Sequence, residues 1–254
     1  NGGTFNVSIG TNSSRGLTSG DYNVAVGSNA LYAITTGSDN VAIGHNALMT
    51  EDTGTQNVAI GYESLKVLNY DAAGINVGIG YRSGIDLSTG THNVFVGGFS
   101  GFEATTNAGS VFLGYQAGKN TKGDYHNNVA IGMQSLSGVH TASGTVAIGY
   151  QSLEELTSGA GNSAIGYRAG DELTTGANNV IIGYNALHSA DGAEHENTVV
   201  GSNAGSLIDN DASSDNVLIG YLAGSGGSGE IDRCVAIGHQ AMDGTTTIGG
   251  TQNI

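Results

Sequence analysis

The feature that most constrains the fold is a short repeat that runs through the whole chain of 254 residues. Its most regular form is Asn-Val-Ala-Ile-Gly, as in residues 40–44, 57–61 and 128–132. Fourteen copies follow one another at intervals of 17 to 19 residues, and Thr247-Ile248-Gly249 is a candidate for a fifteenth, incomplete copy. We call the glycine of each copy its anchor glycine. The anchor glycines are Gly10, Gly27, Gly44, Gly61, Gly80, Gly97, Gly114, Gly132, Gly149, Gly166, Gly183, Gly201, Gly220 and Gly238.

The spacing and the residue types indicate an all-β fold, a parallel β-solenoid of about 14–15 coils with a 17–19-residue period. A period of about 17 is too short for repeats built from helix pairs. Val or Ile stands both one and three residues before nearly every anchor glycine, and these β-branched residues favour strands. The absence of Pro from the chain suits continuous ladders between coils. We therefore expect coils of two short strands and two turns, in one continuous domain over residues 1–254.

Side-chain alternation along the strand predicts which residues face a partner. The Val and Ile that flank the central strand residue point the same way, so we place them, Ile131 among them, inside the coil. The central residue points the other way and is apolar and large in several consecutive coils. Exposed apolar strips are costly, so a second chain is expected to cover them. The predicted subunit-interface residues are Phe95, Phe112, Ile181, Val199 and Leu218. The alternative is that these larger side chains fill a locally wider coil interior.

The motif resembles the head repeats of trimeric autotransporter adhesins, the YadA-like heads. The longer form, with Tyr-Asn-Ala-Leu after the glycine, looks more like repeats in tail fibres of bacteriophages and related injection machines; residues 178–187 match it best. This resemblance implies a left-handed β-roll, with three chains packed about one axis as a coaxial homotrimer.

The same resemblance implies a structural and adhesive role, either as a phage-type tail fibre or receptor-binding shaft, or as the head or stalk of a bacterial surface adhesin. The expected partners are two further copies of the chain and a cell-surface receptor or neighbouring fibre protein. The expected location is the virion tail fibre or the extracellular surface. A monomeric β-solenoid with ligand-binding or lyase activity is the alternative from another functional class.

Charge and composition exclude several other classes. Seven Lys and Arg against 22 Asp and Glu give a net charge of −15, which argues against binding nucleic acid. The apolar runs are too short to span a membrane, so no membrane insertion of this segment is expected. One Cys cannot form a disulfide within the chain, and Cys234, in place of Asn, is expected to be a small buried residue.

No set of residues has the spacing of a catalytic, cofactor or metal site, and we expect no enzyme activity. His188 and His195, with the acids around them, are the nearest approach to a metal site. Stacked carboxylates such as Asp86 and Glu103 are expected to be screened by solvent rather than bridged by a cation.

Overall fold

A computed structural model describes residues 3–208, 213–226 and 231–244, and the candidate fifteenth copy at residues 247–249 lies outside them. Within these ranges the protein has fourteen strands of three residues each and no helix. The chain forms two compact units, Asn1–Asn127 and Asn128–Ile254. The strands mark about thirteen coils with a period near 17 residues, and the prediction of a parallel β-solenoid is confirmed.

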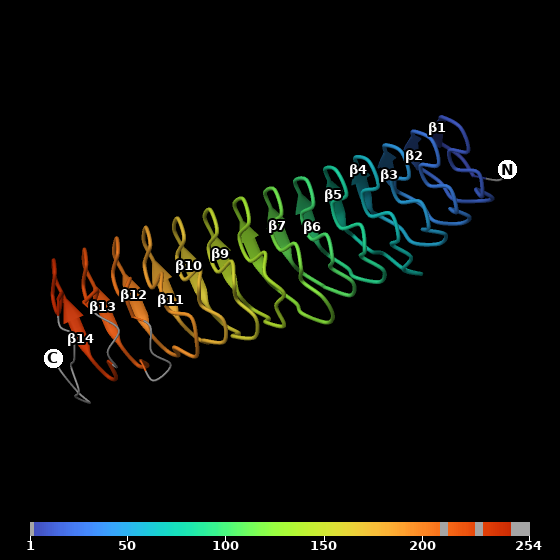
Figure 1. Ribbon diagram of the computed structural model, residues 1–254. Helices are drawn as coiled ribbons and strands as arrows, with labels where there is room; N and C mark the ends of the chain where they lie inside the picture. Colours follow the sequence, from blue (N-terminus) through green and yellow to red (C-terminus); the bar gives the residue numbers. More distant parts are fainter. Residues whose placement is uncertain (1–2, 209–212, 227–230, 245–254) are drawn as a thin grey trace. The chain divides into compact units, whose positions relative to one another are not determined.

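Each strand ends on the residue before an anchor glycine (Figure 1). In the first unit the strands are β1 (Val7–Ile9), β2 (Val24–Val26), β3 (Val41–Ile43), β4 (Val58–Ile60), β5 (Val77–Ile79), β6 (Val94–Val96) and β7 (Val111–Leu113). In the second unit they are β8 (Val129–Ile131), β9 (Val146–Ile148), β10 (Ser163–Ile165), β11 (Val180–Ile182), β12 (Thr198–Val200), β13 (Val217–Ile219) and β14 (Val235–Ile237).

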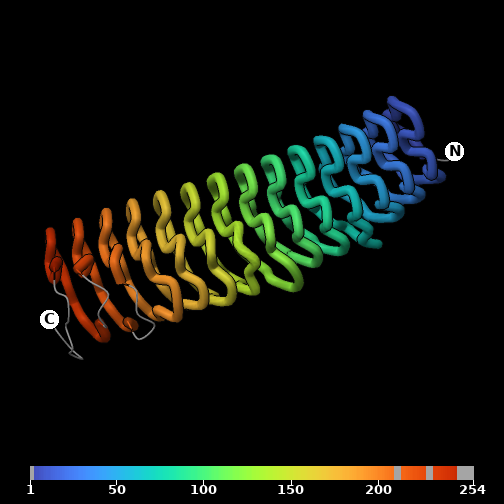
Figure 2. The backbone as a smooth tube through the Cα atoms, viewed as in Figure 1, coloured from blue at the N-terminus to red at the C-terminus, as the bar shows by residue number. Residues whose placement is uncertain are grey.

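Neighbouring strands within each unit pair in parallel and in register, so equivalent residues of successive coils lie side by side. The turns are bonded between coils as well: Leu31 N–H donates to the Ala47 carbonyl at 3.1 Å, and Leu48 N–H to the Ser64 carbonyl at 3.0 Å. Figure 2 shows the loops of successive coils following one another in each unit. Because most segments of a coil hydrogen-bond to the equivalent segment of the next coil, the backbone N–H and C=O groups find their partners within the stack.

The prediction of a second strand in each coil is wrong. Opposite the strands the chain forms turns, and the extended pairing there is reduced to isolated bridges such as Thr55 with Ala73 and Thr91 with Ala108. The physical reason is backbone conformation. Each coil contains residues with positive φ, such as Asn46 at 56° and Leu48 at 48°, which interrupt an extended chain.

A buried ladder of asparagines precedes the strands. In the first unit Asn57 N–H donates to Asn40 Oδ1 at 3.0 Å, and Asn76 N–H donates to Asn57 Oδ1 at 3.1 Å. The Asn40 side-chain amide also donates to the Gly54 carbonyl across the coil at 2.8 Å. Each side chain thus ties its own coil to the next. Cys234 ends such a run in the second unit, buried as predicted, with its N–H donating to Asn216 Oδ1 at 2.9 Å.

The two faces of the strands are the reverse of those predicted. The central residue of every strand from β2 to β14 is buried, whereas the flanking Val and Ile are half-buried or exposed. Ile131, predicted to lie inside the coil, is one of the half-buried residues. The coil interior is narrow, so it takes Ala at the centre of the strand, beside Leu from the turn four residues after the anchor glycine. Ala130 and Leu136 are such a pair, both fully buried.

Large central residues occur where glycine replaces leucine in the turn of the same coil or of the coil before it. Ile181, whose own turn carries Leu187, extends toward Gly170 of the preceding coil. A Cβ atom added at Gly101 would lie 2.9 Å from Cδ2 of Phe95, and one at Gly170 would lie 2.8 Å from Cδ1 of Ile181. A Cβ at Gly224 would lie 2.7 Å from Cδ2 of Leu218. These distances are too short for a real side chain, so the strand residue and the turn residue share one volume of the interior.

Candidate functional site

The five predicted interface residues all lie inside the chain's own coils. Phe95 and Phe112 stack on each other at 5.1 Å between ring centroids and are fully buried. The prediction that they face neighbouring chains is wrong, because the missing turn side chains leave room for them in the interior. The same holds for the rest of the set, which has no exposed surface in the single chain: Phe95, Phe112, Ile181, Val199 and Leu218.

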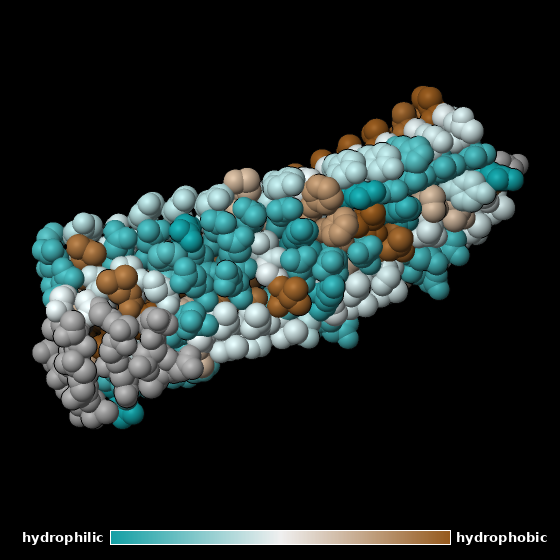
Figure 3. All heavy atoms as spheres, in the orientation of Figure 1, coloured by the Kyte–Doolittle hydropathy of each residue, from teal (hydrophilic) through white to brown (hydrophobic). Residues whose placement is uncertain are grey.

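The surface left open is the outer face of the strands, formed by the Val or Ile one and three residues before each anchor glycine. We call it the Val/Ile face. Ile165 is 42% exposed and Ile182 is 38% exposed on adjacent strands β10 and β11. In the first unit a row of hydrophobic residues follows strands β1 to β5 (Figure 3). The residues of this face can be identified from the sequence as strand residues. Their β-branched side chains favour a strand but do not indicate which side of the strand faces the coil interior.

The residue directly after the anchor glycine forms a second exposed column, rich in tyrosine, which we call the aromatic ladder. Tyr150, Tyr167 and Tyr184 stack at 5.1 Å between successive ring centroids. In the first unit His45, Tyr62 and Tyr81 stack at 5.3 Å. Because each ring covers the face of the next, the ladder presents mainly ring edges and phenol hydroxyls along its length.

The histidines proposed as the nearest approach to a metal site have separate partners. His188 Nδ1 lies 2.5 Å from Asp171 Oδ1, and Asp171 also accepts a hydrogen bond from Arg168 Nε at 2.6 Å. His195 Nδ1 instead accepts a hydrogen bond from the Ala177 N–H at 2.9 Å. In the described part of the chain, no group of three or more His, Cys, Asp or Glu side chains is placed to hold a metal ion.

The stacked carboxylates have protein partners or neighbours that affect their ionisation. Lys122 Nζ lies 3.0 Å from Glu103 Oε2, and burial followed by the Glu103 charge raises the pKa of Asp86. In the second unit burial, then Glu155 and Asp171, raise the pKa of Glu154. Burial first, and neighbouring protein charges second, therefore make Asp86 and Glu154 harder to ionise.

Burial strongly shifts the pKa values of two ionisable side chains inside the coils, Glu51 and His140. Burial raises the pKa of Glu51 from 4.5 to about 7, although its carboxylate accepts hydrogen bonds from the N–H groups of Gly54 at 2.8 Å and Tyr70 at 3.4 Å. Burial lowers the pKa of His140 from 6.5 to about 4. Glu51 stands in a column that otherwise holds Ile34 and Leu68 in neighbouring coils. These groups lie within the packed interior and make the stability of the fold sensitive to pH.

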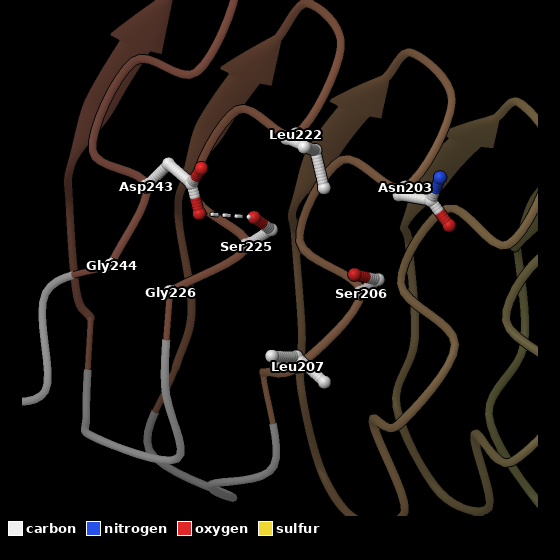
Figure 4. A pocket seen from close by; sticks show the side chains of 8 residues that line it. All are labelled: Asn203, Ser206, Leu207, Leu222, Ser225, Gly226, Asp243 and Gly244. Atoms are coloured by element: carbon white, nitrogen blue, oxygen red, sulfur yellow. Dashed lines mark hydrogen bonds between the residues drawn. The ribbon is translucent and has the colours of Figure 1, made fainter.

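A hollow of about 390 Å³ lies on the turns of the last described coils (Figure 4). Ser225 Oγ donates to Asp243 Oδ1 at 2.9 Å beside it, and the leucines give it an apolar edge. Its lining residues are Asn203, Ser206, Leu207, Leu222, Ser225, Gly226, Asp243 and Gly244.

Comparison of the chain with models of protein families, with curated proteins and with solved structures found no match. Within the described ranges, none of the chain forms a helix with the length and hydropathy needed to cross a membrane. Each unit exposes two surfaces that repeat from coil to coil, the Val/Ile face and the aromatic ladder.

Proposed function

We propose that this protein is a structural and adhesive fibre segment, in a phage-type tail fibre or receptor-binding shaft, and that it assembles as a homotrimer of left-handed β-rolls. Its place would be the virion or another extracellular surface. The observation that supports this proposal is the Val/Ile face, which repeats in every coil and is partly exposed to solvent in the single chain. The number of three chains and the kind of fibre rest on the resemblance of the repeats.

The cost of leaving this face in water supports assembly. Its side chains recur at one strand spacing, so they form strips rather than isolated exposed residues. Burial of apolar surface contributes about 25 cal/mol for each Å² removed from water, and strips covering many coils add these contributions. Contiguous apolar surface of this kind marks interaction sites in proteins.

The distribution of charge favours another copy of this chain as the partner that covers the Val/Ile face. With a net charge of −15, two copies repel wherever their acidic turns approach. The Val/Ile face and the adjoining aromatic ladder contain no Asp, Glu, Lys or Arg in any of the fourteen repeats. Copies that meet on this face keep their carboxylates apart, and identical repeats allow every coil to make the same contact.

The mass of the chain in solution tests this proposal. Analytical ultracentrifugation should give about three times the mass of one chain at micromolar concentration. The double variant Ile165→Glu with Ile182→Glu should keep its β-sheet circular dichroism and dissociate, because both charges would lie on the outer face. The matched control carries Ser158→Glu with Thr175→Glu, which places the same charges on exposed turns of the same region. A wild-type monomer, or equal dissociation of both variants, contradicts assembly through this face.

The adhesive part of the proposal has its own test. The turns and the aromatic ladder expose side chains that differ from coil to coil, which suits contact with a receptor. Genes for tail components beside the gene of this chain would support the tail fibre. Genes for secretion and outer-membrane anchoring would contradict it in favour of a bacterial surface adhesin.

A further inference from the structure

In the second unit the aromatic ladder is interrupted at one position, where a coil carries no aromatic residue after its anchor glycine. Before the gap, the ring of Tyr184 stacks on that of Tyr167. After the gap, the ring of Tyr221 packs against that of His239, with 5.2 Å between the ring centroids. The residue between them in the column is Ser202, one coil from each. Tyr184 is 53% exposed and Tyr221 is 47% exposed. Each of these rings has an aromatic neighbour on the side away from Ser202.

The width of this gap follows from the fold. Backbone hydrogen bonds hold the coils on both sides of Ser202: Asn203 N–H donates to the Tyr184 carbonyl at 2.8 Å, and Leu222 N–H donates to the Ser202 carbonyl at 3.1 Å. The two tyrosines are therefore two strand spacings apart, about 10 Å. Since stacked rungs lie 5.1 Å apart elsewhere in this unit, the gap accepts one ring in the stacking position.

The first unit contains a missing rung that the chain fills itself. Gly98 interrupts the ladder between Tyr81 and Tyr115, and the ring of the next residue, Phe99, lies against both. Its centroid is 5.2 Å from that of Tyr81 and 6.0 Å from that of Tyr115, edge-on to each. A gap of this width in this column thus accommodates a six-membered ring. At Ser202 the next residue is Asn203, which has no ring to offer.

The polar groups at the second gap indicate the kind of ring. Asn203 Nδ2 donates to Ser202 Oγ at 3.3 Å, so a hydroxyl and an amide lie where Gly98 offers only backbone. Asn203 and Leu222, the residues that follow Ser202 and Tyr221 in the chain, also line the 390 Å³ hollow (Figure 4). A pyranose has apolar C–H faces that stack on aromatic rings and a rim of hydroxyls that hydrogen-bond to such groups.

We propose that the gap between Tyr184 and Tyr221 binds one pyranose ring of a glycan. The ring lies between the two phenol faces, and its hydroxyls bond to Ser202 Oγ and the side-chain amide of Asn203. This inference rests on the proposed adhesive function, for which it names the class of receptor.

The test fills the gap with the residue that the ladder uses elsewhere. Saturation-transfer NMR on the full chain uses the methyl β-pyranosides of glucose, galactose and N-acetylglucosamine as probes, with p-cresol as the aromatic alternative. At least one pyranoside should bind the wild type, and Ser202→Tyr should weaken that binding at least tenfold. Tyr is native to this column in seven coils, so the variant is expected to fold. The matched control is Ser28→Tyr, in the same column but without tyrosines in the adjacent coils, and it should bind like the wild type.

Three results overturn the inference: no pyranoside binds the wild type, Ser202→Tyr binds as well as Ser28→Tyr, or p-cresol alone binds at the gap. Sedimentation of the same samples separates this failure from that of the assembly. A trimer that binds no pyranoside removes only the glycan site, whereas a monomer whose binding is lost in Ser202→Tyr removes only the proposed trimer.

Discussion

The ring of Phe112 occupies the place that a side chain at Gly118 would need, and a Cβ atom added at Gly118 would overlap that ring. The two residues belong to one coil, Phe112 at the centre of β7 and Gly118 in the following turn. Elsewhere the same two positions hold Ala and Leu, as in Ala147 and Leu153.

Exchanging the two residue types should show that they share one volume. Phe112→Ala alone should lower the free energy of unfolding by about 3–5 kcal/mol, because it leaves a cavity. Adding Gly118→Leu to this variant should restore a large part of the loss. Leu is native at this turn position with a φ of 50° at Leu153, close to the 58° of Gly118. Urea unfolding of the two single variants and the double variant measures the coupling.

The outcome that contradicts shared packing is simple additivity. Gly118→Leu alone should destabilise the fold by overpacking against Phe112. If the double variant loses the sum of the two single losses, the residues act independently.

Thr145→Asn should stabilise the second unit. Thr145 stands in the asparagine ladder, and its N–H donates to Asn128 Oδ1 at 2.9 Å, but its buried Oγ1 makes no hydrogen bond in the described structure. An asparagine there supplies the acceptor and the amide that Asn57 supplies in its own coil. The expected gain is about 1 kcal/mol in the free energy of unfolding, measured by urea denaturation. Asn57→Thr is the matched reverse change and should lose a similar amount.

Glu51 should make the protein less stable as the pH rises. Its folded pKa of about 7 exceeds the ordinary 4.5, so the folded state binds this proton more tightly than the unfolded state. The free energy of unfolding should therefore fall between pH 4.5 and 7, by about 3 kcal/mol, and level off above that range. Glu51→Gln removes the titration, and its advantage over the wild type should appear at pH 8 and shrink at pH 4. A constant difference across this range contradicts the assignment.

His140 should have the opposite effect at lower pH. Its folded pKa of about 4 lies below the ordinary 6.5, so the unfolded state takes up the proton first as the pH falls. The free energy of unfolding should drop by about 3 kcal/mol between pH 6.5 and 4. His140→Gln should flatten this part of the profile. Thermal unfolding of both single variants from pH 4 to 8 separates this effect from that of Glu51, since the two slopes oppose each other between pH 4.5 and 6.5.

The sequence was sufficient to predict the period, the parallel stacking and the position of every strand, because anchor glycines and β-branched residues recur in fixed places. It was also sufficient for the burial of Cys234, since the Asn column is internal. It did not reveal that the opposite side of the coil is built from turns. Positive φ at residues such as Leu48 is unusual for leucine and is imposed by the bonds between coils.

The faces were predicted wrongly for a reason visible in particular residues. Alternation groups Val129 with Ile131 and separates them from Ala130, but it does not say which group is inside. The deciding signal is a correlation between columns: Phe112 occurs with Gly118, whereas Ala130 occurs with Leu136. Ile181 keeps Leu187 in its own turn and has Gly170 in the coil before it, so the compensation also extends between neighbouring coils. Residues that share interior volume compensate in this way, and the pattern marks the central strand residue as the inner one.

The in-register pairing of equivalent residues has a consequence for how such a chain changes over generations. Ala42 pairs with Ala59 and Ala25 pairs with Ala42, so each coil presents the same bonding edge as the coil it follows. Deleting residues 42–58 would set Ala25 against Ala59 and re-form the same kinds of hydrogen bond. Recombination between repeats can therefore shorten or extend a stack by one coil at a time, with each product able to fold as its parent did.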